Sequence, residues 1–350
     1  MVAKYKINDK VILTDSGGGR NLFVDGAVTF NDSDGKTLSL TNTKKTLAPD
    51  FFDEYFYSFQ GGISGYVSGG RQPSSPTIVN TIDKFSFSID ANGTDVGDLS
   101  EARYGTAGQS SSDNGYTSGG INGSSVVVNT IDKFPFATDG NASDVGNLSQ
   151  QRYFMTGQSS RTNGYTSGGF SPHLDTIDKF PFSVDADATD VGNLTVARRY
   201  HAGQSSSESG YSSGGDPNSD VIDKFPFSSD DNASDVGNLT QSRYTITGQS
   251  SDVSGYTSGG ILPVSASTVN VIDKFPFSSD DNASDVGDLS LVRYNVIGQS
   301  SVQNGYTSGG INPLPNVQNV IDKFPFSSDA NASDVGDLSQ GRYQATGQQV

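Results

Sequence analysis

The stretch GYTSGG at residues 115–120 decides the fold, because it returns through most of the chain. Exact and near copies start 45 to 50 residues apart. A period of this length overrides the usual expectation of two or three domains for a chain of 350 residues, and it predicts one large repeat domain. The six copies stand at 65–70, 115–120, 164–169, 210–215, 255–260 and 305–310.

Each repeat unit contains four short extended segments. In the unit that starts at Ile131 these read RYxxxGQ, GYxSGG, NxIDKFPF and DVGxL, and turns rich in Ser, Asn, Asp and Gly separate them. No segment has helical periodicity. Four short strands per unit are typical of a propeller blade, so we expect an all-β protein with a six-bladed β-propeller of four-stranded antiparallel blades. The double glycine is expected to permit a backbone conformation or a close approach that a Cβ would block.

The two ends of the repeat series complement each other. The first unit begins at residue 65 with no RYxxxGQ segment before it, whereas the last unit ends with Arg342–Gln348 and no GYxSGG after it. One end therefore supplies the segment that the other end lacks. This predicts a closed ring in which the C-terminal strand completes the first blade.

The order of motifs resembles that of the kelch-repeat β-propellers over about residues 63–349. An Arg, an aromatic-led strand ending in Gly-Gly, and a strand with an Asp follow one another, here as Arg103, Tyr116, Gly119–Gly120 and Asp132. The chain departs from that family's pattern at the closing aromatic, which is Trp in typical kelch units. This chain contains no Trp, and Val145 stands at that place.

One Arg and one strand Asp recur in every unit. An unpaired buried charge is costly, so we expect each Arg to pair with an Asp and to connect strands within the fold. A constellation repeated in every unit is structural, since an active site usually uses residues found once. The arginines are Arg103, Arg152, Arg198, Arg243, Arg293 and Arg342, and the aspartates are Asp83, Asp132, Asp178, Asp223, Asp273 and Asp322.

All length variation lies between the double glycine and the next IDKF isoleucine. These loops contain six to eleven residues, and in an up-and-down blade they all emerge on one face. Repeat insertions confined to one face often mark a binding face, although unselected surface loops also drift in length. The side chains best suited to anchor a partner there are Arg71, Phe170, His173, Leu262 and Leu314.

A D-x-[ND]-x-[ST]-D turn in each unit presents oxygen atoms at alternate positions. In the first unit these belong to Asp90, Asn92, Thr94 and Asp95. The spacing suits calcium, but there is no downstream bidentate Glu, and Asx side chains that cap their own turn explain it equally well. We therefore expect no cofactor, with calcium as the open alternative.

Composition limits the function classes. The net charge of −17 argues against nucleic-acid binding and against anionic membranes. With no Cys, two His and three Glu, and without GxSxG, HExxH or a phosphate loop, no catalytic site is expected. A secreted or cell-surface carbohydrate-active or carbohydrate-binding propeller remains the alternative, because the abundant Asp residues allow a carboxylate pair.

The first 54 residues differ from the repeats, so we divide the chain into a β-rich attachment segment, 1–54, and a propeller, 55–350. KYKINDKVIL, NLFVDGAVTF and KTLSLT predict strands, and TNTKKTLAPD predicts a linker. The run DSGGGRNL at 15–22 is similar to the attachment modules of fibre-like proteins of tailed bacteriophages, and the GYxSGG…IDKFPF array resembles virion-associated repeat proteins of such phages.

The phage resemblance implies a non-enzymatic virion protein. Such a protein would be made in the host cytoplasm, and the start of the chain, MVAKYKINDK, lacks the apolar region of a secretory signal. The N-terminal segment would contact other virion proteins. The propeller, displayed on a tail or capsid appendage, would bind a host-surface glycan or protein or help to assemble the appendage.

Overall fold

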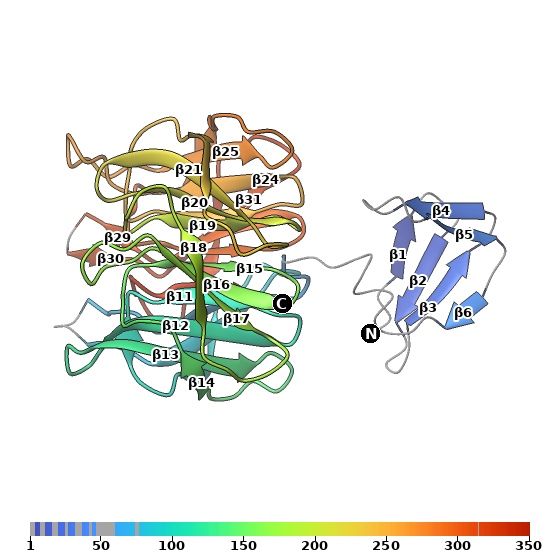
Figure 1. Cartoon of the computed structure of the whole chain (residues 1–350), viewed down its shortest axis with the longest axis horizontal. Coiled ribbons are helices and arrows are strands. Elements are labelled where there is room, and N and C mark those ends of the chain that lie inside the picture. The colour runs from blue at the N-terminus through green and yellow to red at the C-terminus, as the bar shows by residue number, and fades with distance from the viewer. Residues whose placement is uncertain are drawn as a thin grey trace. The chain divides into compact units, whose positions relative to one another are not determined.

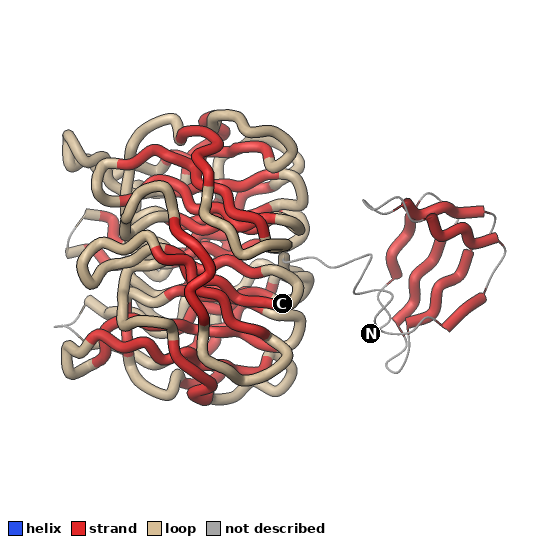
Figure 2. The backbone as a smooth tube through the Cα atoms, in the orientation of Figure 1, coloured by secondary structure: helices blue, strands red, loops and turns tan. Residues whose placement is uncertain are grey.

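A computed structural model describes residues 60–73, 77–313 and 315–350, together with six strands between residues 4 and 46. The chain separates into two compact units, Met1–Tyr57 and Ser58–Val350. The described residues form strands and loops only (Figure 2). No helix long and apolar enough to cross a membrane occurs among them.

The second unit is a β-propeller of six four-stranded antiparallel blades, as the sequence predicts (Figure 1). The innermost strand of each blade faces the central axis and has the sequence xGQS or TGQQ. In chain order the innermost strands are β11 (Ala107–Ser110), β15 (Thr156–Ser159), β19 (Ala202–Ser205), β23 (Thr247–Ser250), β27 (Ile297–Ser300) and β33 (Thr346–Gln349). The second strands are β7 (Ser64–Ser68), β12 (Asn114–Asn122), β16 (Asn163–Ser167), β20 (Ser209–Gly215), β24 (Ser254–Ser258) and β28 (Asn304–Ser308).

The outer half of each blade comes from the IDKF and DVG segments. The third strands are β8 (Thr81–Ser86), β13 (Val127–Pro135), β17 (Thr176–Pro181), β21 (Ser219–Pro226), β25 (Val271–Pro276) and β31 (Val320–Pro325). The fourth strands are β9 (Thr94–Asp98), β14 (Ser143–Asn147), β18 (Thr189–Asn193), β22 (Ser234–Asn238), β26 (Ser284–Asp288) and β32 (Ser333–Asp337). Short additional strands are β10 (Arg103–Tyr104), β29 (Ile311–Asn312) and β30 (Asn316–Val317).

The C-terminal strand closes the ring. β33 pairs antiparallel with β7, so the first blade has the order β33-β7-β8-β9. Gln348 aligns with Tyr66, just as Gln109 aligns with Tyr116 in the second blade. The complementary ends of the repeat series are thus joined in one sheet, as predicted.

The RYxxxGQ segment is not one continuous strand. Its third residue adopts a left-handed conformation, with φ of 58° at Phe154, and this interrupts the extended backbone. Only the last three residues of the motif, with the residue that follows them, form the innermost strand, and the Arg and Tyr lie before it. The expectation of one strand over the whole motif is therefore wrong.

The double glycine has the role that the sequence predicts. Both glycines have positive φ in all six blades, for example 58° at Gly119 and 106° at Gly120. A Cβ on Gly119 would lie 2.7 Å from the carbonyl oxygen of Arg152. This conformation and this close approach together exclude a side chain at the end of the second strand.

Aromatic packing holds neighbouring blades together. The Tyr of each second strand lies against the two Phe of the KFPF motif in the next blade. Tyr116 stacks on Phe182 with ring centroids 4.9 Å apart and tilts against Phe180 at 5.4 Å. The same arrangement occurs at all six seams, where the tyrosines are Tyr66, Tyr116, Tyr165, Tyr211, Tyr256 and Tyr306.

Polar side chains also cross every seam. Near the axis, Gln109 Nε2 donates to the carbonyl oxygen of Tyr165 in the next blade, at 3.0 Å. At the outer end, Lys84 Nζ contacts Asp139 at 2.8 Å. The equivalent Gln and Lys contacts recur at the other seams, including the one where the last blade meets the first. The ring is thus closed by the same contacts that join its other blades.

The described residues of the first unit form six strands, where the sequence predicts three. KYKINDKVIL and NLFVDGAVTF each split in two, and the expected linker contributes Lys44–Thr46 as a strand of a four-stranded sheet. That sheet has the order β1-β2-β3-β6, and β4 and β5 form a separate hairpin. The strands are β1 (Lys4–Ile7), β2 (Val11–Asp15), β3 (Arg20–Val24), β4 (Ala27–Asn31), β5 (Thr37–Thr41) and β6 (Lys44–Thr46).

Candidate functional site

The two ends of the propeller differ in charge. We call the end with the loops between second and third strands the loop face; the hairpin β29–β30 projects from it, at the left in Figure 1. These six loops contain only Arg71, His173, Asp175, Asp216 and Asp220 as ionisable residues. At the opposite end, each segment from KFPF to DVG contains two or three Asp. The negative charge of the propeller is therefore concentrated away from the loop face, which is close to neutral.

An aromatic collar surrounds the axis on the loop face. It is built from the residue that follows the buried Arg in each blade, together with Phe154 and Tyr200 one position further along. All of these side chains are partly exposed, whereas the seam tyrosines are buried. Every tyrosine in residues 60–350 belongs to one of these two sets. The collar consists of Tyr104, Tyr153, Phe154, Arg199, Tyr200, Tyr244, Tyr294 and Tyr343.

Beneath the collar, six left-handed residues form a closed ring of backbone hydrogen bonds. Each N–H donates to the carbonyl of the equivalent residue in the preceding blade, for example Phe154 N to Gly105 O at 2.7 Å. The φ angles lie between 52° and 67°. The six members of this left-handed ring are Gly105, Phe154, Tyr200, Thr245, Asn295 and Gln344.

The left-handed ring contains strain that the fold does not require. Gly105 shows that glycine satisfies the backbone at this position, yet the other five blades place larger residues there. Phe154 and Tyr200 are the extreme cases, since bulky side chains are outliers at positive φ, and each costs roughly 1–3 kcal/mol. Strain of this kind clusters at functional sites, so the side chains of this ring are the first candidates for contact with a ligand.

The aromatic side of the collar is tightly packed. The rings of Phe154 and Tyr200 stack with centroids 4.0 Å apart. Phe154 also lies over Gly105, where a Cβ would come within 2.8 Å of its ring. Tyr153 meets Phe154 edge to face at 4.6 Å. Gly105 thus makes room for the Phe154 ring, and three blades together present one aromatic surface.

The structure brings two of the expected anchors together. The ring of Phe170 contacts Tyr153 at 5.5 Å and His173 at 5.0 Å. The Arg199 guanidinium lies 4.3 Å from the Phe170 ring centroid, and its Nε donates to Asp216 Oδ2 at 2.9 Å. Phe170 and His173 therefore form one cluster with the collar on the third and fourth blades.

The other three expected anchors have different outcomes. The Arg71 guanidinium lies 4.6 Å from the centroid of Tyr104 and 6.0 Å from that of Tyr343, so Arg71 also joins the collar. Leu262 lies in its own loop, partly buried, where its N–H donates to Ser267 O. Leu314 lies outside the described residues.

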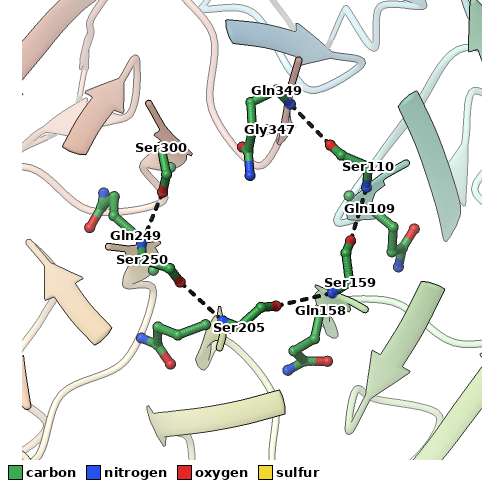
Figure 3. A pocket seen from close by; sticks show the side chains of 16 residues that line it. Gln109, Ser110, Gln158, Ser159, Ser205, Gln249, Ser250, Ser300, Gly347 and Gln349 are labelled. Carbon is green, nitrogen blue, oxygen red and sulfur yellow. Dashed lines mark hydrogen bonds between the residues drawn. The ribbon is translucent and has the colours of Figure 1, made fainter. Parts of the chain in front are cut away.

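A channel follows the axis below the left-handed ring. Its upper part is a cavity of about 110 Å³ lined by the residue after each ring member, including Thr106, Met155 and His201. Its lower part, of about 70 Å³, is lined by the GQS segments. There the Gln349 N–H donates to the Ser110 hydroxyl, and the N–H of each Ser donates to the next Ser hydroxyl as far as Ser300 (Figure 3).

Several buried polar atoms without a hydrogen-bond partner lie near the loop-face end of the axis. Among the described residues, ten buried side-chain atoms have no hydrogen-bond partner, and six of them are the Nε atoms of the repeated arginines. The other four are Arg71 Nε, Thr106 Oγ1, His201 Nδ1 and Gln344 Oε1, all in the collar, the left-handed ring or the cavity beneath. Buried polar groups are normally satisfied, so these four atoms distinguish the loop-face end of the axis from the rest of the propeller.

Burial shifts the pKa values of ionisable groups near the loop-face end of the axis. The imidazole of His201 is fully enclosed, and burial together with nearby Arg198 holds its pKa well below the usual value. Its Nε2 lies 3.1 Å from Ser167 O. Burial also raises the pKa of Tyr200 and of Tyr294. The hydroxyl groups of Tyr200 and Tyr294 therefore stay protonated at neutral pH and can act as hydrogen-bond donors.

The repeated arginines and aspartates form buried ion pairs. In each blade Arg Nη2 lies 2.6–2.9 Å from Asp Oδ2, and both side chains are 0% exposed. The same Asp accepts hydrogen bonds from the Ser or Thr after the preceding fourth strand, as Asp132 does from the N–H and hydroxyl of Ser100. Burial lowers the pKa of Arg103, and Asp132 opposes this effect. These contacts fix each blade to the segment that joins it to the preceding blade.

Three of the four residues expected as oxygen ligands in the D-x-[ND]-x-[ST]-D turn already make contacts through a side-chain oxygen atom. Asp90 pairs with Lys323 of the last blade, and Asn92 Oδ1 accepts from Asp337 N. Asp95 Oδ1 accepts from Gly97 N, while Thr94 lies in the pairing of β9. Only Asp95 caps its own turn, whereas Asp90 and Asn92 contact the neighbouring blade. No group of three or more His, Asp or Glu suited to a metal occurs in the part of the chain that the structure describes.

No protein-family model matches the chain, and no curated protein is significantly similar to it. The sequence analysis missed the collar because it treated RYxxxGQ as a uniform strand. A signal was present, since the position after the RY pair varies among Gly, Phe, Tyr, Thr, Asn and Gln within an otherwise repeated motif.

Proposed function

We propose that this protein is a non-enzymatic binding protein whose propeller contacts its partner through the loop face. The observation that supports this proposal most directly is the partly exposed aromatic collar on a nearly neutral end of an acidic propeller. Tyr and Arg dominate the energetics of binding surfaces, because they offer a large contact area together with a polar group. The acidic opposite face is better suited to remaining solvated.

We further propose that the setting is a tailed-phage virion. The DSGGGRNL run and the GYxSGG…IDKFPF array support this part of the proposal through their resemblance to virion proteins. The N-terminal unit would attach to other virion proteins, and the propeller would act on a tail or capsid appendage in host-surface binding or appendage assembly. Co-purification of the protein with particles, and its labelling on them in electron micrographs, would test this setting.

A secreted or cell-surface carbohydrate-active propeller is the second candidate. The axial cavity below an aromatic collar favours it, because sugar substrates pack on aromatic rings in such clefts. The two candidates separate in one assay. A carbohydrate-active enzyme releases sugar from a panel of oligosaccharides, whereas a virion binding protein does not.

The role of the loop face is tested by loop replacement. Loops 261–271 and 311–320 would be shortened to the DPNSDV sequence that residues 216–221 already use. Since a native blade closes with this short loop, we expect an unchanged unfolding transition together with weaker attachment to host cells or to the neighbouring virion protein. Substitution of Asp252, in a turn on the opposite face, by Asn is the matched control. Unchanged attachment by the folded loop variant would mean that the partner binds elsewhere.

A further inference from the structure

We propose that the left-handed ring and the collar form a single binding site for the terminal pyranose of a neutral glycan. This inference rests on the proposed binding function and names its ligand class. A pyranose has an apolar C–H face and a rim of hydroxyl groups, so its site needs an aromatic surface beside groups that donate and accept hydrogen bonds. The order of residues around the ring provides both.

One half of the ring is aromatic. Three consecutive blades contribute Gly105, Phe154 and Tyr200, with the Phe154 ring seated over the glycine and stacked on Tyr200. Tyr104 lies beside them, its ring centroid 6.2 Å from that of Phe154. These partly exposed rings offer one continuous surface for the C–H face of a sugar.

The other half of the ring is polar. The next three blades contribute Thr245, Asn295 and Gln344. The Thr245 hydroxyl is bound to Tyr244 O, but Gln344 Oε1 has no partner among the described residues. An amide group both donates and accepts, which matches a hydroxyl group. Arg71, whose Nε has no partner among the described residues, lies where the two halves meet, with its guanidinium 4.6 Å from the Tyr104 centroid and 6.0 Å from that of Tyr343.

Charge favours a neutral ligand. Arg199 is paired with Asp216, and Arg71 faces two tyrosine rings. The rest of the propeller is strongly acidic, which repels anions as they approach. A neutral sugar avoids this repulsion.

The internal repeat supplies matched variants. Gly105 demonstrates that glycine fits the ring position, so Phe154→Gly with Tyr200→Gly removes the aromatic half and relieves backbone strain. Asn295→Gly with Gln344→Gly removes the polar half by the same substitution. Val264→Ser, at a loop-face residue that is 97% exposed and lies outside the collar, is the control.

The full-length protein and the three variants would be titrated with methyl glycosides of glucose, galactose and mannose and with neutral oligosaccharides on an array, with sialylated and uronic-acid glycans in parallel. We expect binding of at least one neutral glycan, at least tenfold weaker in both ring variants and unchanged in Val264→Ser. Each ring variant should keep a single cooperative unfolding transition by circular dichroism, which separates a loss of binding from a loss of the fold.

Binding that requires a sialic or uronic acid carboxylate would overturn the neutral-glycan inference. So would an absence of glycan binding by a protein that still attaches to cells or virion proteins through its loop face, since the ligand would then be a protein and the proposed function would stand. Glycan binding that survives both ring variants would place the sugar outside this site.

Discussion

Arg342 Nη2 lies 2.7 Å from Asp83 Oδ2, so an ion pair joins the last residues of the propeller to its first blade. In the other five blades the equivalent pair is local in the sequence, as between Arg103 and Asp132. Only at the closure does the same contact link segments that are far apart in the chain. The ring is therefore closed by the segment that comes last in the sequence.

Removal of residues 342–350 should abolish the single cooperative unfolding transition. The deletion takes away β33, its pairing with β7 and the partner of Asp83, and it exposes an unpaired sheet edge. Urea unfolding followed by circular dichroism would check this. A truncated protein with the midpoint and slope of the parent would show that the ring does not need its closing strand.

Substitution Arg103→Met should destabilise the protein by about 3–5 kcal/mol, because it leaves the buried Asp132 carboxylate without its cation. The double variant Arg103→Met with Asp132→Leu should recover part of this loss. Lys133→Met is the control, since its pair with Asp185 is partly exposed and such pairs contribute only about 0–1 kcal/mol. Equal effects of the two single variants on the free energy of unfolding would contradict the buried role of Arg103.

His201 should make the protein less stable in mild acid. Its pKa in the folded state lies well below the unfolded value near 6.5, so below that pH the unfolded chain binds a proton that the folded protein excludes. Stability is thus lost as the pH falls through the unfolded pKa, at up to about 1.4 kcal/mol per pH unit. His201→Met, which copies Met155 of the neighbouring blade, should gain about 2 kcal/mol relative to the parent between pH 7.5 and pH 5. Parallel pH profiles of the two proteins would show that folding leaves the pKa of His201 unchanged.

Excess chelator should leave the melting temperature unchanged. The turn oxygens that could bind calcium are engaged with Lys323, with Asp337 N and with Gly97 N. A ligand bound only to the folded state would raise stability with its concentration, so its removal would lower the melting temperature. Differential scanning calorimetry with and without added calcium would measure this, and a fall of several degrees on chelation would restore calcium as a component.

Much of the architecture could be predicted because several positions of the repeat hold residue types that indicate a particular structural role. The double glycine marks a backbone that excludes a Cβ, and the pattern of one Arg and one Asp in every unit marks a buried pair. The two ends of the series mark the closure. Each of these inferences depends on a local physical demand that few residue types satisfy.

The candidate site was harder to predict because its demands are not local. Phe154 and Tyr200 occupy a left-handed conformation that sequence patterns associate with glycine, and only Gly105 follows that rule. Likewise, Asp90 reaches Lys323 because the ring closes, so its partner lies in a different blade. The two expected anchors that meet at Phe170 and His173 were found from residue type alone, while the tyrosines around them were hidden in a motif interpreted as a strand.

The glutamine that reaches from each innermost strand to the next blade has a further consequence. Because Gln348 contacts Tyr116 as Gln109 contacts Tyr165, every blade meets its two neighbours through the same interface. Blades with interchangeable edges can be exchanged by recombination between repeats without redesign of their neighbours. The polypeptide could equally be opened at another connection and rejoined at Val350 by circular permutation. Sequence changes can then accumulate in the loop face and the collar, while the interfaces between blades stay the same from repeat to repeat.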